Sequence, residues 1–392
     1  MKILFYCSEY PPFPTGGIGR VTAIIAEELV SQGHEVHVIG FYKSMNNDFE
    51  YSEEKGVKVF RYRLNTFIEQ KPFLFQCIRK FRLSKYISQK EIDFVENTIQ
   101  NHIDKYNIQL LELTDFYPFV LYGPNLKFRK FRVPTILRVH GSSSFVETMS
   151  GTGKEYYIEN DSRHFNRCDF IIAVSEYSLS YIINNYSISD RIPKSVVYNP
   201  IEDSYLKITE DKEDEILFVG KLIRTKGCFS LAHAFNIIAA KYPNIKLSFV
   251  GKGDQEGLLN VIDSKYHDRV QFYGYWDREK LVNIIDQCSF ACVPTYFENF
   301  SMVALEIMAR GKTLLFTERT SGTEIVKDGI NGFTVDPDNI EDISTKLDIL
   351  INDTGLRQKF GKNAYNTIKD KFRTSVIISQ LVEQYNQISC NN

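Results

Sequence analysis

Two carboxylates, Glu298 and Glu306, frame the stretch ENFSMVALE with seven residues between them. Glu298 precedes a helical pattern and Glu306 lies inside it, among apolar residues of the run VALEIMA. An unpaired carboxylate in such a setting is costly to bury, so a defined partner is expected for Glu306. The alternative is that Glu306 is an ordinary residue on the exposed face of a helix.

The helix that begins at Ser301 offers a site for an anion. We expect the backbone amides of Phe300, Ser301 and Met302 to point out of its first turn, where the helix dipole adds positive potential. A pyrophosphate on this helix end would place Glu298 beside an attached sugar. Glu306 lies five residues after Ser301, roughly 7–8 Å along the axis at the helical rise. There its carboxylate could accept hydrogen bonds from a ribose.

Three other loops carry candidate residues, each directly after a predicted strand. Lys221 and Lys226 lie in VGKLIRTKG, where cations would neutralise a diphosphate, although they could equally be solvated surface lysines. His140 follows a strand in RVHGSSSF and is a candidate for the reaction centre or for a structural role. Gly16 and Gly17, in PPFPTGGIGR, would let backbone amides approach a phosphate. The next strand ends VIGFYK, without the acidic residue of a dinucleotide-binding fold, which argues against a dehydrogenase.

Strand and helix patterns alternate along the 392 residues, which predicts parallel sheets covered by helices. The length favours two domains. We expect an N-terminal Rossmann-like domain at 1–200, a C-terminal one at 201–372, and a C-terminal helix at 373–392 that could pack back on the first domain. Ligands bind at the carboxyl ends of such strands, where the loops above lie. The expected strands are 2–7, 35–40, 57–62, 108–114, 135–141, 169–175, 195–199, 215–220, 246–253, 270–274, 288–294 and 313–318.

Composition narrows the class of protein. The chain is 43% hydrophobic and 24% charged with a net charge of -2, which disfavours a disordered chain and a general polyanion binder. Seven scattered cysteines without a CxxC pair indicate reduced core thiols and a cytoplasmic location. The apolar run at the N-terminus is too short for a signal peptide, and no run reaches the length of a membrane span.

Taken together and in order, these motifs resemble the family 4 retaining glycosyltransferases of the GT-B fold, two doubly wound Rossmann-like domains that face a central cleft. ENFSMVALE is similar to the family's Glu-x7-Glu motif, and GGIGR, VHG, FVGKLIRTKG and EIVKDGINGFTV are similar to its other conserved segments. The resemblance spans nearly the whole chain. It implies a sugar transfer from a nucleotide diphosphate, as co-substrate, to an acceptor hydroxyl, with no cofactor and no metal.

The resemblance also implies a role for each candidate. Glu298 would bind sugar hydroxyls beside the anomeric carbon, Glu306 the ribose, and Lys221 and Lys226 the diphosphate as it leaves. Gly16 and Gly17 would approach the phosphates, and His140 would lie beside the sugar. The catalytic set is therefore His140, Lys226 and Glu298, and the donor-binding set is Gly16, Gly17, Lys221, Lys226, Asn299, Phe300, Ser301, Met302 and Glu306.

Three departures from the family pattern bear on specificity. Lys221 stands where arginine is usual, so bidentate phosphate binding would give way to a point charge. ENFS replaces the commoner EGFG, so Asn299 and Ser301 could tune the choice of donor. YNPI replaces an asparagine-glycine turn near the domain boundary.

Two basic segments, 71–90 and 127–132, interleave cations with bulky apolar residues. This pattern suits an anionic membrane surface, and equally a basic helix that packs its apolar face inward. A peripheral position on the inner face of the plasma membrane, with a lipid-linked glycan as acceptor, is therefore expected, and nucleic acid is not. The triplet DPD at 336–338 has the form of a metal-binding DxD, but we predict a proline turn that leads into a helix cap at Asp338 or Asn339.

The resemblance thus implies a hexosyltransferase, and surface polysaccharide synthesis, such as capsule or O-antigen, is its expected pathway. Three alternatives remain open. A synthase or phosphorylase for soluble sugars would turn over a water-soluble acceptor or free phosphate. A nucleotide-sugar epimerase would release free epimer without acceptor. A non-catalytic sugar-nucleotide-binding module would bind without turnover.

Overall fold

The computed structural model describes residues 1–12, 16–43, 45–64, 84–121, 123–149, 151–210, 214–274 and 278–390. The chain divides into two compact units. Unit 1 comprises Met1–Pro200 together with Ile377–Asn392, and unit 2 comprises Ile201–Val376. The assignment of an acceptor side to the first unit and a nucleotide side to the second stays a prediction.

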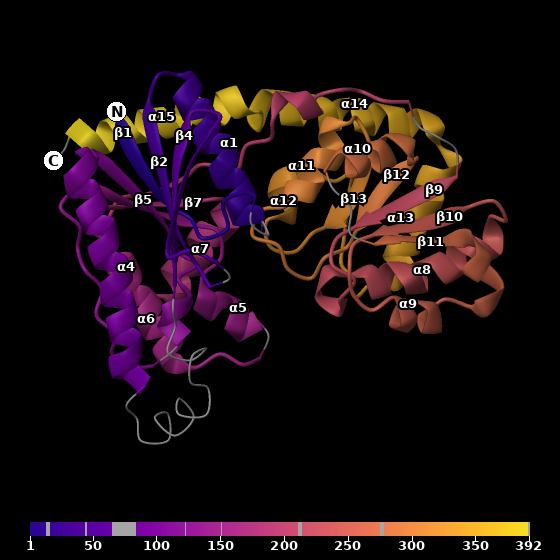
Figure 1. Cartoon of the computed structure of the whole chain (residues 1–392). Helices are drawn as coiled ribbons and strands as arrows, with labels where there is room; N and C mark the ends of the chain where they lie inside the picture. The colour runs from indigo at the N-terminus through magenta and orange to yellow at the C-terminus, as the bar shows by residue number, and fades with distance from the viewer. Residues whose placement is uncertain are drawn as a thin grey trace. The chain divides into compact units, whose positions relative to one another are not determined.

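Unit 1 is built on an eight-stranded sheet with helices on both faces (Figure 1). The strand order is β3-β4-β2-β1-β5-β6-β7-β8, and every pair is parallel except β3 with β4. The order therefore reverses between β1 and β5. The strands are β1 Lys2–Tyr6, β2 Glu35–Tyr42, β3 Phe49–Glu54, β4 Val57–Arg63, β5 Leu110–Thr114, β6 Thr135–Val139, β7 Phe170–Ala173 and β8 Lys194–Val196.

The helices of unit 1 follow the predicted alternation. Helix α4 places Ile92, Val95, Ile99 and Ile103, spaced three and four residues apart, in the core against β1, β5 and β6. The described helical segments are α1 Gly17–Ser31, α4 Ser84–Tyr106, η1 Pro118–Leu121, α5 Ser143–Met149, α6 Glu155–Asn166, α7 Glu176–Asn185 and α15 Thr374–Cys390, which belongs to unit 1 from Ile377 on.

Unit 2 contains a six-stranded sheet in the order β11-β10-β9-β12-β13-β14, with every pair parallel. This is the doubly wound order of a dinucleotide-binding fold, with its reversal between β9 and β12. The strands are β9 Glu215–Val219, β10 Lys246–Val250, β11 Val270–Gly274, β12 Phe290–Val293, β13 Thr313–Thr317 and β14 Phe333–Val335.

Helices cover both faces of this second sheet as well (Figure 1). The described segments are η2 Asp203–Tyr205, η3 Arg224–Lys226, α8 Cys228–Lys241, α9 Gln255–Val261, η4 Ser264–Arg269, α10 Arg278–Gln287, α11 Met302–Ala309, α12 Gly322–Ile325, α13 Ile340–Asn352 and α14 Thr354–Lys371. The prediction of two doubly wound α/β domains is confirmed. Strands β3 and β14 are additional to those predicted.

A buried ionic network fixes helix α15 to unit 1. Arg138 on β6 pairs with Glu112 on β5 at 2.6 Å, and both side chains are buried. The Tyr385 hydroxyl, from α15, donates to the second oxygen of Glu112 at 2.5 Å. Because these groups are withdrawn from water, each depends on the others for its hydrogen bonds.

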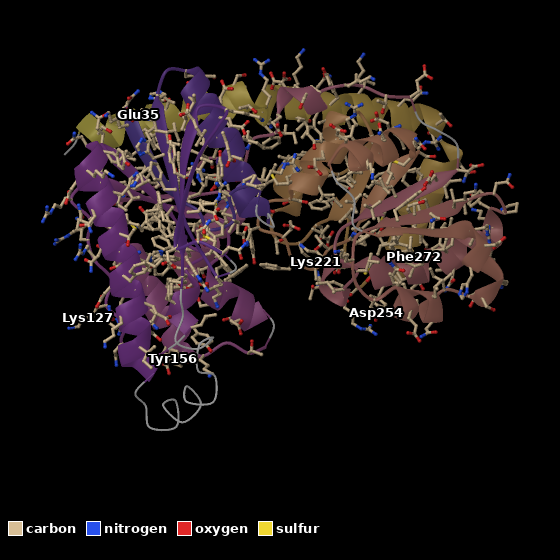
Figure 2. The ribbon with its side chains drawn as sticks, viewed as in Figure 1. Glu35, Lys127, Tyr156, Lys221, Asp254 and Phe272 are labelled. Atoms are coloured by element: carbon tan, nitrogen blue, oxygen red, sulfur yellow. The ribbon has the colours of Figure 1, made fainter. Side chains whose placement is uncertain are left out.

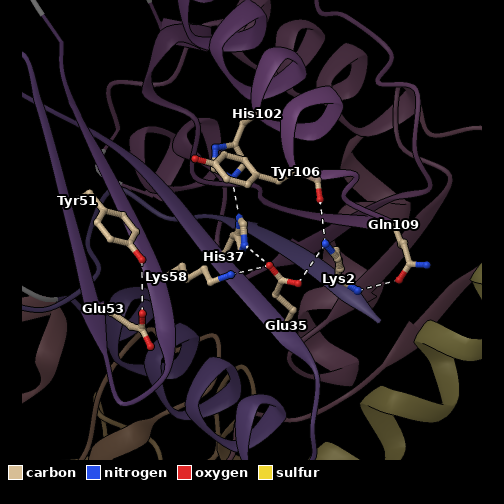
Figure 3. Close-up of polar contacts among 9 residues, drawn as sticks. All are labelled: Lys2, Glu35, His37, Tyr51, Glu53, Lys58, His102, Tyr106 and Gln109. Carbon is tan, nitrogen blue, oxygen red and sulfur yellow. Dashed lines mark hydrogen bonds and ion pairs between the residues drawn. The ribbon is translucent and has the colours of Figure 1, made fainter.

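A second polar network lies at the amino ends of β1 and β2 (Figure 3). The rings of His37 and His102 contact each other at 2.8 Å between Nδ1 and Nε2, and both side chains are buried. His37 Nε2 contacts Glu35 at 3.0 Å, and Lys58 donates to the same carboxylate at 2.7 Å. The Lys58 and His37 hydrogen bonds hold the pKa of Glu35 down at about 2.

The basic segment 127–132 presents its cations outward and turns its aromatic rings inward. Lys127, Arg129, Lys130 and Arg132 are exposed, whereas Phe131 is buried and Phe128 half-buried. Lys130 pairs with Asp169 and Arg132 with Asp104. The rings are therefore packing residues. Most of segment 71–90 lies outside the described residues, and among the described ones no helix is long and apolar enough to cross a bilayer.

Candidate active site

Two loops meet at the point where the strand order of unit 2 reverses, one after β9 and one after β12. Gly227 makes the approach possible, because a Cβ at this position would lie 1.8 Å from the carbonyl oxygen of Pro294. The loops are then joined by hydrogen bonds from Tyr296 N and Thr295 Oγ1 to the Thr225 carbonyl, at 3.0 and 3.1 Å. This edge of a doubly wound sheet is where such folds bind ligands.

The same two loops bring Lys226 and Glu298 together. Lys226, the last residue of η3, forms an ion pair of 2.7 Å with the Glu298 carboxylate. Its ammonium group also lies 3.4 Å from the Phe297 carbonyl. The lysine and glutamate side chains are 30% and 23% exposed, so both remain accessible to a ligand. The structure therefore places side by side the cation predicted for a diphosphate and the carboxylate predicted for a sugar.

Helix α11 begins as the sequence analysis expected. Ser301 is its N-cap, and its hydroxyl accepts from the Ala304 amide at 3.3 Å. Glu306 is 1% exposed, so it is a buried residue of this helix and the alternative of an exposed surface residue is wrong. Phe300 is also buried, with its ring 5.5 Å from that of Phe372. Asn299 and Met302 are half-buried.

The loop between β13 and α12 holds the main chain of Glu298. The Glu298 amide donates to Thr320 Oγ1 at 3.2 Å. The Glu298 carbonyl accepts from Ser321 Oγ at 3.0 Å and from the Ser321 amide at 3.4 Å. No sequence pattern singled out these two residues, because their contact with Glu298 spans more than 20 positions and depends on neighbouring parallel strands.

The triplet DPD belongs to a structural cluster close to this loop. Arg319 pairs with both Asp336 and Asp338 at 2.6 Å, and its guanidinium lies 5.2 Å from the centre of the Tyr296 ring. The cap of helix α13 is Asn339, whose side chain accepts from the Asp342 amide. The two aspartates thus bind an arginine, as suits a turn and cap rather than a DxD metal site.

Lys221 and the two glycines of the first loop are exposed. Lys221 follows β9 and lies in the loop that also holds Lys226 (Figure 2). Gly16 is the N-cap of α1 and Gly17 its first residue. A Cβ at Gly17 would meet nothing within 4 Å inside the described protein, so packing does not require glycine there. At Gly16, by contrast, a Cβ would lie 2.5 Å from the Glu9 carboxylate, so the phosphate role of these glycines stays a prediction.

His140 lies at the carboxyl end of β6, where a buried carboxylate fixes its main chain. Asp115 accepts from the amides of His140 and Gly141, each at 2.9 Å. Burial raises the pKa of Asp115 to about 7, against the two amide bonds that lower it. Burial, with the Arg138 cation nearby, lowers the pKa of His140 to about 3, so its imidazole is neutral at neutral pH. Asp115 was not foreseen from the sequence.

A further buried group supports the serine loop that follows His140. Asp161 accepts from the Ser144 amide at 3.1 Å. The Tyr186 hydroxyl contacts Ser142 Oγ at 2.6 Å and Ser144 Oγ at 2.8 Å. Burial raises the pKa of Asp161 to about 7. His140 and the glycines belong to unit 1, and the lysines, Glu298 and Glu306 to unit 2.

Comparison with known proteins identifies the class. Residues 15–205 match the family model described as Glycosyltransferase Family 4, and residues 204–367 match the model described as Glycosyl transferases group 1. An uncharacterized glycosyltransferase of Methanocaldococcus jannaschii is 27% identical over 98% of both chains. The capsular polysaccharide biosynthesis glycosyltransferase CapM of Staphylococcus aureus is 29% identical over 48% of this chain and 50% of its own.

A solved structure extends the likeness to the fold. Anabaena HepE, in complex with UDP and glucose, superimposes with a TM-score of 0.72 at 19% identity and covers 98% of this chain and 99% of its own. The two parallel sheets and the doubly wound strand orders described above agree with this likeness. The chain therefore has the GT-B fold, and its two family-model matches, which together span residues 15–367, make it similar to the family 4 glycosyltransferases.

Proposed function

We propose that the chain is a retaining, metal-independent hexosyltransferase that moves a sugar from a nucleotide diphosphate to an acceptor hydroxyl. The observation that carries the proposal is the Lys226–Glu298 pair of 2.7 Å at the strand-order reversal of unit 2. The N-terminus of α11 follows Glu298 by four residues. A cation, a carboxylate and a helix start in one place suit a sugar diphosphate.

The leaving diphosphate would be stabilised by charge on this chain's own residues. Lys226 and Lys221 supply point charges, and the first amides of α11 supply a partial positive charge. These groups can do the work that a divalent cation does elsewhere, so no metal is needed. The departing phosphate would take the proton of the acceptor hydroxyl as the acceptor attacks from the same face, which retains the anomeric configuration.

The carboxylates would hold the two sugars of the donor. Glu298, which keeps one oxygen on Lys226, can accept from hydroxyls of the transferred sugar. Glu306, inside α11, would bind the ribose. The neutral imidazole of His140 suits a position beside developing positive charge, because it adds no repulsion there. Gly16 and Gly17, at the start of α1, are proposed as phosphate-binding residues.

For the acceptor we propose a growing surface glycan on a lipid carrier at the inner face of the plasma membrane. The similarity to a capsular polysaccharide glycosyltransferase supports the glycan. The exposed cations Lys127 and Arg129 support an anionic surface as its location. Sedimentation with vesicles of phosphatidylglycerol, compared with phosphatidylcholine, tests the location. Equal binding to both, or unchanged binding by Lys127→Glu/Arg129→Glu, would argue against it.

The reaction is tested with UDP-, GDP- and ADP-sugars in the presence of chelator, and the release of nucleoside diphosphate is measured. UDP-sugars come first, because HepE was solved with UDP. We expect slow release from one donor, lost in Glu298→Ala and retained in the control Glu256→Ala, an exposed residue of the same unit. Release that requires added metal would refute metal independence. Equal release by both variants would refute the role of Glu298.

Analysis of the products and of donor binding distinguishes the three alternative functions. Free epimer formed without an acceptor would indicate a nucleotide-sugar epimerase. Turnover of a water-soluble sugar, or phosphorolysis, would indicate a synthase or phosphorylase. Donor binding by calorimetry without release under any acceptor would indicate a non-catalytic module. Retention itself is read from the anomeric configuration of the product by NMR.

A further inference from the structure

Thr320 has a backbone conformation that its side chain disfavours. Its φ is +55°, in the left-handed region, where a β-branched residue is a strong outlier. Such strain persists where surrounding contacts determine the conformation, and it is concentrated at functional sites. The contact made from this position is specific, because the Thr320 hydroxyl accepts the Glu298 amide at 3.2 Å.

Ser321 binds the main chain of Glu298 as well. It is 0% exposed and donates twice to the Glu298 carbonyl, from Oγ at 3.0 Å and from its amide at 3.4 Å. The amide and carbonyl of Glu298 are therefore both bonded to one loop. The Glu298 side chain remains directed to Lys226, at 2.7 Å. Its backbone is fixed while its carboxylate remains accessible.

The loop itself is anchored on both sides of Thr320. Arg319 donates its amide to Thr317 Oγ1 at 3.0 Å, and its side chain binds Asp336 and Asp338. The main chain after Ser321 packs closely on β13, since a Cβ at Gly322 would lie 1.9 Å from the Thr317 carbonyl oxygen. The loop is thus a rigid support that can impose a conformation on Glu298.

We propose that Thr320 is a positioning residue for the transfer reaction. Its strained backbone and its hydroxyl set the main chain of Glu298, so that the carboxylate meets the transferred sugar in one orientation. The inference rests on the proposed role of Glu298 and deepens it. A displaced carboxylate would still allow the donor diphosphate to bind through the lysines, so the effect should fall on kcat more than on the donor KM.

Three variants of Thr320 test whether its hydroxyl and its backbone conformation matter. Thr320→Ser keeps the hydroxyl, Thr320→Val keeps the shape without it, and Thr320→Gly removes both the hydroxyl and the strain. We expect kcat to fall by about 10- to 100-fold in the valine and glycine variants, with the donor KM little changed. The serine variant should keep kcat within about threefold of wild type. Thr320→Gly should melt no lower than wild type, so lost activity there is not lost folding.

Turnover and amide hydrogen exchange distinguish a failure of this proposal from a failure of the proposed function. If Glu298→Ala is inactive but Thr320→Val and Thr320→Gly have wild-type kcat, Thr320 does not position Glu298. If Thr320→Ser is as impaired as Thr320→Val, the hydroxyl is not the cause and the proposal also fails. If Glu298→Ala is fully active, the proposed function fails instead. Amide hydrogen exchange of the 294–301 peptide needs no turnover. This exchange should accelerate in Thr320→Gly and not in Thr320→Ser. Unchanged exchange in both variants would show that Thr320 does not fix the main chain of Glu298.

Discussion

The buried histidine pair of unit 1 makes a stability prediction that needs no ligand (Figure 3). Because ionised Glu35 can only accept, His37 Nε2 carries the proton toward it and His37 Nδ1 accepts from His102 Nε2. The pair is then neutral. Protonating His102 would add a cation among buried aromatic rings, near His37 and Lys105. Burial, followed by these two neighbours, lowers the pKa of His102 to about 3.

Proton linkage gives the direction in which the stability of unit 1 changes with pH. An unfolded histidine titrates near 6.5, so between about pH 6.5 and about pH 3 the unfolded chain binds the proton that folded His102 refuses. Stability is fully present above that range and is lost as pH falls through it. With a folded pKa of about 3, linkage gives a loss of about 2 kcal/mol between about pH 7.5 and about pH 5 from this residue alone. Lys2, Lys58, Glu35 and Tyr106 also face the pair.

The test compares wild type with His102→Gln, which keeps an amide donor for His37 but does not titrate. Pulse proteolysis across a urea series reports unfolding of unit 1 through cleavage in α4. From about pH 7.5 to about pH 5, wild type should lose about 2 kcal/mol more than the variant. His233→Gln, an exposed residue on α8, should behave as wild type. Parallel losses in wild type and His102→Gln would refute the assignment of the acid sensitivity to His102.

Three more outcomes are expected. Glu298→Gln frees Lys226 from its ion pair, so nucleoside diphosphate should bind about two- to fivefold tighter by calorimetry while turnover falls; weaker binding would contradict this. Burial raises the pKa of Asp161 to about 7, so its contribution to stability is lost as pH rises from about 4 to about 7. Asp161→Asn should therefore gain stability relative to wild type at about pH 8 but not at about pH 4, as read from urea midpoints. Tyr385→Phe leaves buried Glu112 short of one donor and should cost about 1–3 kcal/mol, whereas equal midpoints would show that the bond contributes nothing.

The sequence predicted the parallel strands other than β14, because most of them are short apolar runs that alternate with helical patterns. Strand β3 was not predicted, because it is a half-exposed edge strand, rich in glutamate, that pairs antiparallel to β4. Strand β14 has three residues and gives no periodicity. Helix α11 and its cap could be predicted, since a serine before an apolar run is a local signal.

For the candidate site too, residues marked by a local sequence pattern could be predicted, and residues brought in by long-range contacts could not. Lys226, Glu298 and Ser301 could be predicted because they lie in loops that directly follow predicted strands, Lys226 after β9 and the other two after β12. Thr320 could not, because its contact with Glu298 exists only after β12 and β13 pair side by side. The basic segments show the limit of composition, since interleaved phenylalanines predict an insertion surface and core packing equally well. Phe131 proves to be a core residue.

The Lys226–Glu298 pair has a consequence for how the site meets a donor. Both side chains are partly exposed, so the pair itself contributes little to folding, about 1 kcal/mol or less. In the proposed function, the pair would hold a cation and an anion side by side before the donor arrives. A diphosphate would then draw Lys226 partly away from Glu298, and the sugar hydroxyls would take its place as donors to one oxygen of the carboxylate. This exchange preserves the number of charge-assisted hydrogen bonds only when the bound molecule carries both a diphosphate and a sugar. A nucleoside diphosphate without its sugar would leave Glu298 short of donors, so we expect the pair to favour the donor over the nucleoside diphosphate product.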